Sequence, residues 1–116
     1  MIQTKRVYEK PGKKDGFRVL VDRLWPRGMT IEKASVDLWI KEIAPSDELR
    51  KWFHYEEGNW SEFVKRYKAE LAKKKALLSE MNGLEDQHKI VTLLYGSKDQ
   101  KQNQAVVLAD ILRGKK

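Results

Sequence analysis

The chain has 116 residues, of which 41% are hydrophobic and 35% charged, and its formal net charge is +7. This length and composition predict one soluble globular domain over residues 1–116, and without a signal-peptide-like start or a bilayer-spanning apolar run we expect a cytoplasmic protein with no membrane partner. With no cysteine and only two histidines, disulfides and thiolate nucleophiles are excluded, and we expect no metal site.

The first part of the chain predicts two strands. Residues 2–8 mix β-formers with charge, as an edge strand does. The turn-rich connector over residues 10–16 leaves the orientation of the first pair of strands open. The apolar run over residues 17–21 predicts a buried strand, which ends in a polar loop, residues 22–28, that contains Pro and Gly.

The middle of the chain predicts a short helix, a strand and a second helix. Thr30 is placed to cap a helical turn that runs through Ala34. Residues 36–44 fit a strand better than a helix, because alternate residues are apolar. Ser46 is placed to cap the next helix, which the polar segment over residues 54–58 interrupts.

The longest predicted helix begins at Asn59, which forms a capping-box pattern with Glu62. It is expected to run for about six turns and to cover one face of the sheet, with Gly83 as its C-cap. Helical spacing relates its apolar residues, which are Trp60, Phe63, Val64, Tyr67, Leu71, Leu78 and Met81.

Residues 90–95 are the most strand-like run and are apolar nearly throughout, as in a central parallel strand covered on both faces. A polar loop follows, and Asp99 with Gln102 predicts the cap of the last helix. The apolar stripe of that helix comprises Ala105, Leu108, Ala109 and Leu112, and Gly114 ends it.

This order of strands and helices favours a three-layer α/β domain with a mostly parallel sheet of three or four strands and the last strand in its centre. The loops over residues 22–28 and 96–99 then lie beyond the carboxyl ends of their strands and meet at one edge. Because the second loop opens a helix whose free N–H groups suit an anion, this edge is the predicted ligand crevice.

Four blocks, residues 21–28, 38–46, 49–53 and 91–99, resemble the YeaO-like family of prokaryotic proteins, domain of unknown function 488. They occur in the family's order and spacing across nearly the whole chain, and the resemblance implies a small Rossmann-like α/β fold but no established reaction. A longer, related branch carries Cys and a Cys-His-Arg triplet near the final strand and helix. This chain has Tyr95 and Gln-Asn-Gln in that region.

The loop over residues 22–28 contains four candidate site residues. Asp22 and Arg23 are candidate catalytic residues, an acid and a clamp, or alternatively a charged pair that ties two loops together. Arg27 has a guanidinium suited to bidentate contact with an oxyanion. Trp25 either stacks on a ligand ring or covers the end of the sheet.

The remaining candidates lie farther along the chain. His54 is a candidate general acid or base near neutral pH, or a solvated loop histidine. Lys98 and Asp99 suggest a phosphate-binding turn or an ordinary helix start, and the glycine-rich phosphate-loop and dinucleotide fingerprints are absent. The other candidate ligand-binding residues are Lys41, Tyr95 and Asn103, and no cofactor is predicted.

The leading functional hypothesis is a small protein that binds an anionic ligand, phosphorylated or nucleotide-like, in this crevice, with catalysis on that ligand left open. The alternative is a nucleic-acid-binding or protein-interaction module that uses a basic helix with Lys65, Arg66, Lys68, Lys73, Lys74 and Lys75. The spacing of Glu62 to Arg66 and of Glu70 to Lys74 is that of a solvated, ion-paired face instead. A third possibility is a scaffold whose strand-end loops only lock each other.

Overall fold

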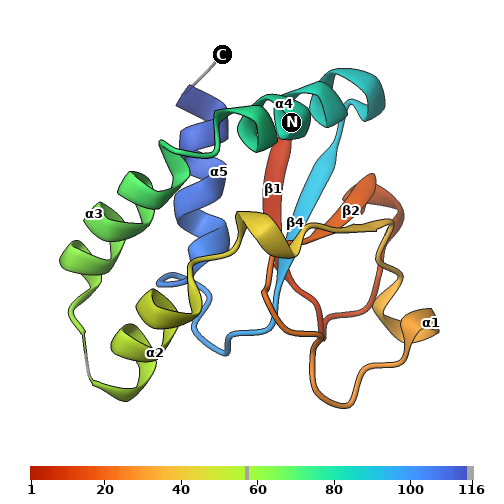
Figure 1. The fold of residues 1–116 in the computed structure, drawn as a ribbon. Helices are drawn as coiled ribbons and strands as arrows, with labels where there is room; N and C mark the ends of the chain where they lie inside the picture. The colour runs from red at the N-terminus through yellow and green to blue at the C-terminus, as the bar shows by residue number, and fades with distance from the viewer. Residues whose placement is uncertain (57, 115–116) are drawn as a thin grey trace.

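The structure, a computed structural model, describes residues 1–56 and 58–114 and contains a four-stranded sheet and five α-helices within them (Figure 1). The strands are β1 (Ile2–Arg6), β2 (Phe17–Leu20), β3 (Leu38–Trp39) and β4 (Val91–Tyr95). The helices are α1 (Ile31–Ala34), α2 (Asp47–Tyr55), α3 (Trp60–Leu71), α4 (Lys75–His88) and α5 (Gln104–Gly114), and two 3₁₀ turns are η1 (Lys13–Asp15) and η2 (Lys41–Ile43).

All strand pairs are parallel, in the order β1-β4-β2-β3. Ile2 and Phe17 both lie opposite Val91, on either side of β4, so the first two strands are separated by the last one and do not form a hairpin. All five residues of β4 are buried, which confirms the predicted central strand. The sequence-based prediction of an α/β fold with a parallel sheet is confirmed.

The two faces of the sheet are covered unequally (Figure 1). On one face Leu93 and Tyr95 of β4 join the large apolar core together with residues of α2, α3, α4 and α5. On the other face Leu94 packs in a smaller cluster with Leu20 and with Ala34 of α1. Side chains alternate between the faces of a strand, so β4 contributes to both clusters. Within the described residues no helix is long and apolar enough to cross a membrane.

The predicted strand over residues 36–44 is wrong in length. Only Leu38–Trp39 pairs with β2, and the Ile40 N–H donates to the Leu20 carbonyl at 3.0 Å, where β2 ends. Residues beyond Ile40 therefore have no partner strand, and they turn into η2, which buries Ile43 instead.

The predicted long helix is two helices, because the chain bends after Leu71. Lys74 leaves helical geometry with φ −118° and ψ 42°, and its Nζ donates to the carbonyls of Glu42 at 2.6 Å and Ala44 at 3.3 Å. These contacts to η2 anchor the bend. Gly83 lies inside α4 and is not its C-cap, since the helix continues to His88.

Three of the predicted N-caps are confirmed: Thr30, Ser46 and Asn59 each accept the backbone N–H three residues on. The cap of α5 is different. Asn103 Oδ1 accepts the Val106 N–H at 3.1 Å, whereas Asp99 accepts the N–H groups of the two residues before Asn103 within the preceding turn. Asp99 therefore stabilises the loop before α5, and Asn103 begins the helix.

Gly83→Ala tests the position of Gly83 within α4. Outside the backbone of its own helix and its chain neighbours, a Cβ added there meets no heavy atom within 4 Å, and Gly83 has no positive φ. We expect the free energy of unfolding to increase by up to about 1 kcal/mol, because alanine loses less conformational entropy in a helix. Urea denaturation measures the change, and a loss of stability would instead indicate a left-handed cap.

Gly16→Ala is the matched control. Gly16 has φ +63°, and its added Cβ would collide with the Ile90 carbonyl. This substitution is expected to lower the free energy of unfolding by roughly 2 kcal/mol or more.

Candidate functional site

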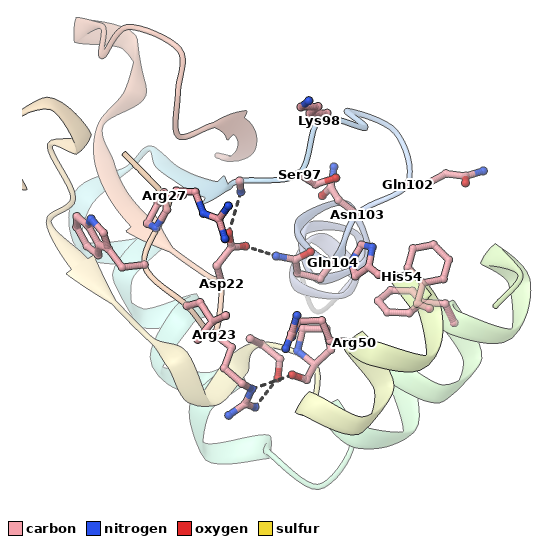
Figure 2. Close-up of a pocket in the computed structure, with 18 of the residues that line it drawn as sticks. Asp22, Arg23, Arg27, Arg50, His54, Ser97, Lys98, Gln102, Asn103 and Gln104 are labelled. Carbon is pink, nitrogen blue, oxygen red and sulfur yellow. Dashed lines mark hydrogen bonds between the residues drawn. The ribbon is translucent and has the colours of Figure 1, made fainter. Parts of the chain in front are cut away.

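A cavity of about 440 Å³ lies at the carboxyl ends of β2 and β4, where the two predicted loops meet (Figure 2). Its walls come from the loop after β2, the loop after β4, the start of α5, and α2 with part of α3. Seven of the residues singled out from the sequence line it: Asp22, Arg23, Trp25, Arg27, His54, Lys98 and Asn103.

Three singled-out residues are not among the lining residues. Lys41 is exposed in η2, with its Nζ 4.5 Å from the centroid of the Trp39 ring. Tyr95 is buried and borders a separate polar hollow beside β1, and burial raises the pKa of its hydroxyl. Asp99 is exposed in the turn before α5. The structure therefore brings together the loop after β2, His54 and Lys98, but not these three.

Asp22 joins three segments at the base of the cavity. One of its carboxylate oxygens accepts the Gly96 N–H at 2.8 Å, and the other accepts the side-chain amide of Gln104. A Cβ at Gly96 would lie 3.0 Å from Asp22 Oδ2, so a glycine allows this close approach. Burial raises the pKa of Asp22 to about 6, although both hydrogen bonds favour the ionised form.

Arg23 contacts carbonyl groups and not Asp22. Its Nε donates to the Pro45 carbonyl at 3.1 Å, and its Nη2 donates to the Ala44 carbonyl at 3.4 Å. These two bonds attach the loop after β2 to the segment between η2 and α2. Asp22 and Arg23 thus tie that loop to two different neighbours.

Arg27 is exposed at the cavity, and its backbone is fixed on both sides. Its carbonyl accepts the Tyr8 hydroxyl at 2.8 Å, Pro26 precedes it, and Gly28 follows with φ +79°. Within residues 1–56 and 58–114, its guanidinium and the Lys98 ammonium make no hydrogen bond or ion pair. Arg27 and Lys98 therefore line the cavity without an ion-pair partner among the described residues.

Trp25 covers the end of the sheet and also borders the cavity. Its indole N–H donates to the Met29 carbonyl at 2.8 Å, and its ring meets Trp39 edge to face at 5.4 Å between centroids. The Trp39 indole N–H donates in turn to the Asp22 carbonyl at 2.7 Å. This packing holds the loop after β2 against the smaller core cluster.

His54 lies in the last turn of α2, where its ring meets Phe53 at 5.3 Å between centroids. Partial burial and the nearby Arg50 guanidinium lower the pKa of His54, so its imidazole is uncharged near neutral pH. Arg50 itself lines the cavity and donates to Asp47 at 2.6 Å.

Sequence reasoning missed some lining residues. Arg50 precedes His54 by four residues on a helix that the sequence predicts, so the i, i+4 spacing was a usable signal. Ser97 belongs to the loop over residues 96–99 that the sequence placed at the crevice, and Gln102 was predicted only as part of a cap pattern. Tyr8 and Gln104 carry no local signal, because tertiary structure brings them to the cavity. Among the described residues no group of three or more His, Asp or Glu is arranged to hold a metal ion.

The basic run over residues 73–75 does not continue one helix face, since it spans the bend and the start of α4. The predicted ion pair between Glu62 and Arg66 is present at 3.0 Å. The predicted pairing of Glu70 with the run is wrong, because Glu70 accepts the backbone N–H of Ser46 at 2.8 Å and its hydroxyl at 2.6 Å.

Comparison of the sequence with known proteins assigns the chain to a family. The family model described as the inactive DUF488-N3 subclade matches residues 1–115. The uncharacterized protein YeaO of Escherichia coli K12 is 46% identical over 112 residues, which cover 97% of this chain and 96% of that protein. The uncharacterized protein Rv3073c of Mycobacterium tuberculosis is 39% identical over 114 residues, or 98% and 95% of the two chains. No solved structure gives a significant match.

The raised pKa of Asp22 predicts how stability depends on pH. The folded protein holds the Asp22 carboxyl proton up to a pKa of about 6, above the ordinary 3.8, so this proton stabilises the folded state. The stabilisation is complete below pH 3.8 and is lost as the pH rises through 6. Asn cannot ionise. We expect the free energy of unfolding of Asp22→Asn, relative to wild type, to rise by about 1 to 3 kcal/mol from about pH 4 to pH 8, measured by urea denaturation.

Asp99→Asn is the control of opposite sign. Backbone N–H groups lower the pKa of this exposed carboxyl, so its stabilisation is present above the ordinary pKa. The stability of Asp99→Asn relative to wild type should therefore fall as the pH rises towards about 4 and stay nearly constant from about pH 4 to pH 8, where Asp22→Asn changes. Parallel pH profiles for Asp22→Asn and wild type would contradict the burial of a titrating Asp22.

Proposed function

This chain belongs to the DUF488 family of YeaO-like proteins, and from that premise we propose that it binds a small anion, phosphorylated or nucleotide-like, in the cavity at the carboxyl ends of β2 and β4. This edge of a parallel sheet is where open α/β proteins commonly bind their ligands. A cavity volume of about 440 Å³ is within the range of pockets that hold small molecules.

The observation that carries the proposal is the pair of cationic side chains, Arg27 and Lys98, that line the cavity with no anionic partner among the described residues. Asp22 is the one carboxylate among the lining residues, and it is occupied by Gly96 and Gln104. A phosphate would supply the missing negative charge, and a guanidinium suits it through two parallel N–H bonds.

Three features favour binding over catalysis. The matching subclade is described as inactive, and the chain has no cysteine to act as a nucleophile. Asp22 and Arg23 are engaged in bonds that hold the cavity walls together, so we assign them a positioning role. The absence of cysteine also fits a reducing cytoplasmic setting, in which phosphorylated metabolites are abundant.

Arg27→Lys tests the proposal. Lysine keeps the charge but loses the planar fork, so we expect binding of a phosphate-bearing ligand to weaken by about 1 to 3 kcal/mol. The melting temperature without ligand should barely change, because the Arg27 side chain is exposed and makes no bond to other described residues. Calorimetric titration with inorganic phosphate, pyrophosphate and ribose 5-phosphate measures the affinities.

Lys98 and Lys101 provide a matched pair on one loop. Both are exposed lysines, but only Lys98 lines the cavity. Lys98→Gln should lower the affinities measured in the same titrations, and Lys101→Gln should leave these affinities nearly unchanged. The proposal fails if Arg27→Lys lowers the melting temperature while the affinities stay as in wild type.

A further inference from the structure

The cavity has two chemically different ends. We call Arg27 and Lys98 its cationic end and Phe53, His54 and Phe63 its aromatic end, and Tyr8, Trp25 and Arg50 line the cavity as well. Figure 2 shows Arg27 and His54 on opposite sides of the cavity. One charged group cannot make use of both ends, so the lining favours a ligand with two different parts.

The aromatic end is a packed wall. The Phe53 ring lies 4.5 Å from Phe63 and 5.3 Å from His54, measured between centroids. Phe63 packs in turn against Trp60 at 5.4 Å and Tyr67 at 5.8 Å. Because neighbouring rings hold each other, little side-chain entropy remains to be lost when another ring stacks against them.

His54 is the exposed ring of this wall, whereas Phe63 is buried. Partial burial and Arg50 lower the pKa of His54, so it presents an uncharged ring near neutral pH. An uncharged imidazole stacks on a flat ring and adds no positive charge to that end. Arg50 also lies near His54, but its guanidinium pairs with Asp47 at 2.6 Å, whereas Arg27 and Lys98 have no such partner among the described residues.

We infer that the ligand carries a flat aromatic ring as well as a phosphate, which is the chemistry of a nucleoside 5′-monophosphate. This inference rests on the proposed function and names its ligand class. The phosphate lies at Arg27 and Lys98, and the base stacks at His54 and Phe53. A sugar phosphate would satisfy only the cationic end and leave the aromatic wall against water.

The test compares a ligand that carries only the phosphate with ligands that carry both the phosphate and an aromatic base. Calorimetric titrations of the full chain use ribose 5-phosphate and the 5′-monophosphates of adenosine, guanosine, cytidine and uridine. At least one nucleotide should bind roughly tenfold or more tightly than ribose 5-phosphate, the effect of stacking one base on an aromatic side chain. Arg27→Lys should weaken the binding of ribose 5-phosphate and of that nucleotide to the same extent.

Variants of the aromatic end locate the base. His54→Ala should remove most of the preference for the nucleotide and leave the affinity for ribose 5-phosphate unchanged. Tyr55→Ala is the matched control, because Tyr55 is the adjacent aromatic residue, is 74% exposed and is not among the lining residues. Phe53→Leu, with the melting temperature followed in parallel, gives a second variant of the same wall.

Each outcome decides between the two proposals. Equal affinities for the nucleotides and ribose 5-phosphate would overturn this inference and leave the proposed function standing. A preference for nucleotides that survives both His54→Ala and Phe53→Leu would also overturn it, because the base would then lie elsewhere. If no phosphate probe binds, the proposed function itself fails.

Discussion

The geometry of the cavity depends on the Asp22 carboxylate, which accepts from the Gly96 N–H and the Gln104 amide. Strand β2 delivers Asp22, strand β4 delivers Gly96, and α5 begins with Gln104, so one side chain joins the carboxyl ends of two strands to a helix. Its burial makes the charged form costly, which is why its pKa rises to about 6. A buried acid with satisfied hydrogen bonds thus fixes the edge of the sheet where parallel α/β proteins bind ligands.

A second set of bonds holds the opposite wall. The Ala44 carbonyl accepts from both Arg23 and Lys74, so the loop after β2 and the bend between α3 and α4 meet at the segment between η2 and α2. Arg23 and Lys74 both donate hydrogen bonds to backbone carbonyl groups, so these two cations have a structural role. Arg27 and Lys98 remain at the cavity without such partners in the described parts of the chain. This distinction between structural and available cations is the reason we propose an anion as the ligand.

Much of the fold could be predicted from the sequence because the signals are local. The apolar run over residues 90–95 indicates a central strand, and Ser46 and Asn59 cap helices through their own backbone neighbours. The bend at Lys74 could not be predicted from the sequence, because contacts with the distant turn η2 produce it. Lys41 was singled out because a strand was extended past the end of β2. Asp99 was predicted as the cap of the last helix from its spacing to Gln102, but Asn103 takes that role in the structure. Gln104 was not selected, since its role arises only when the loops meet.

We propose above all that the carboxyl edge of β2 and β4 is an anion site. Amide chemical-shift mapping of the ¹⁵N-labelled full chain during titration with inorganic phosphate tests this claim most directly. We predict saturable shifts that concentrate in residues 22–28 and 96–104, around Arg27 and Lys98. Shifts confined to residues 65–75 on α3 and the following bend, or no saturable shifts at all, would contradict it.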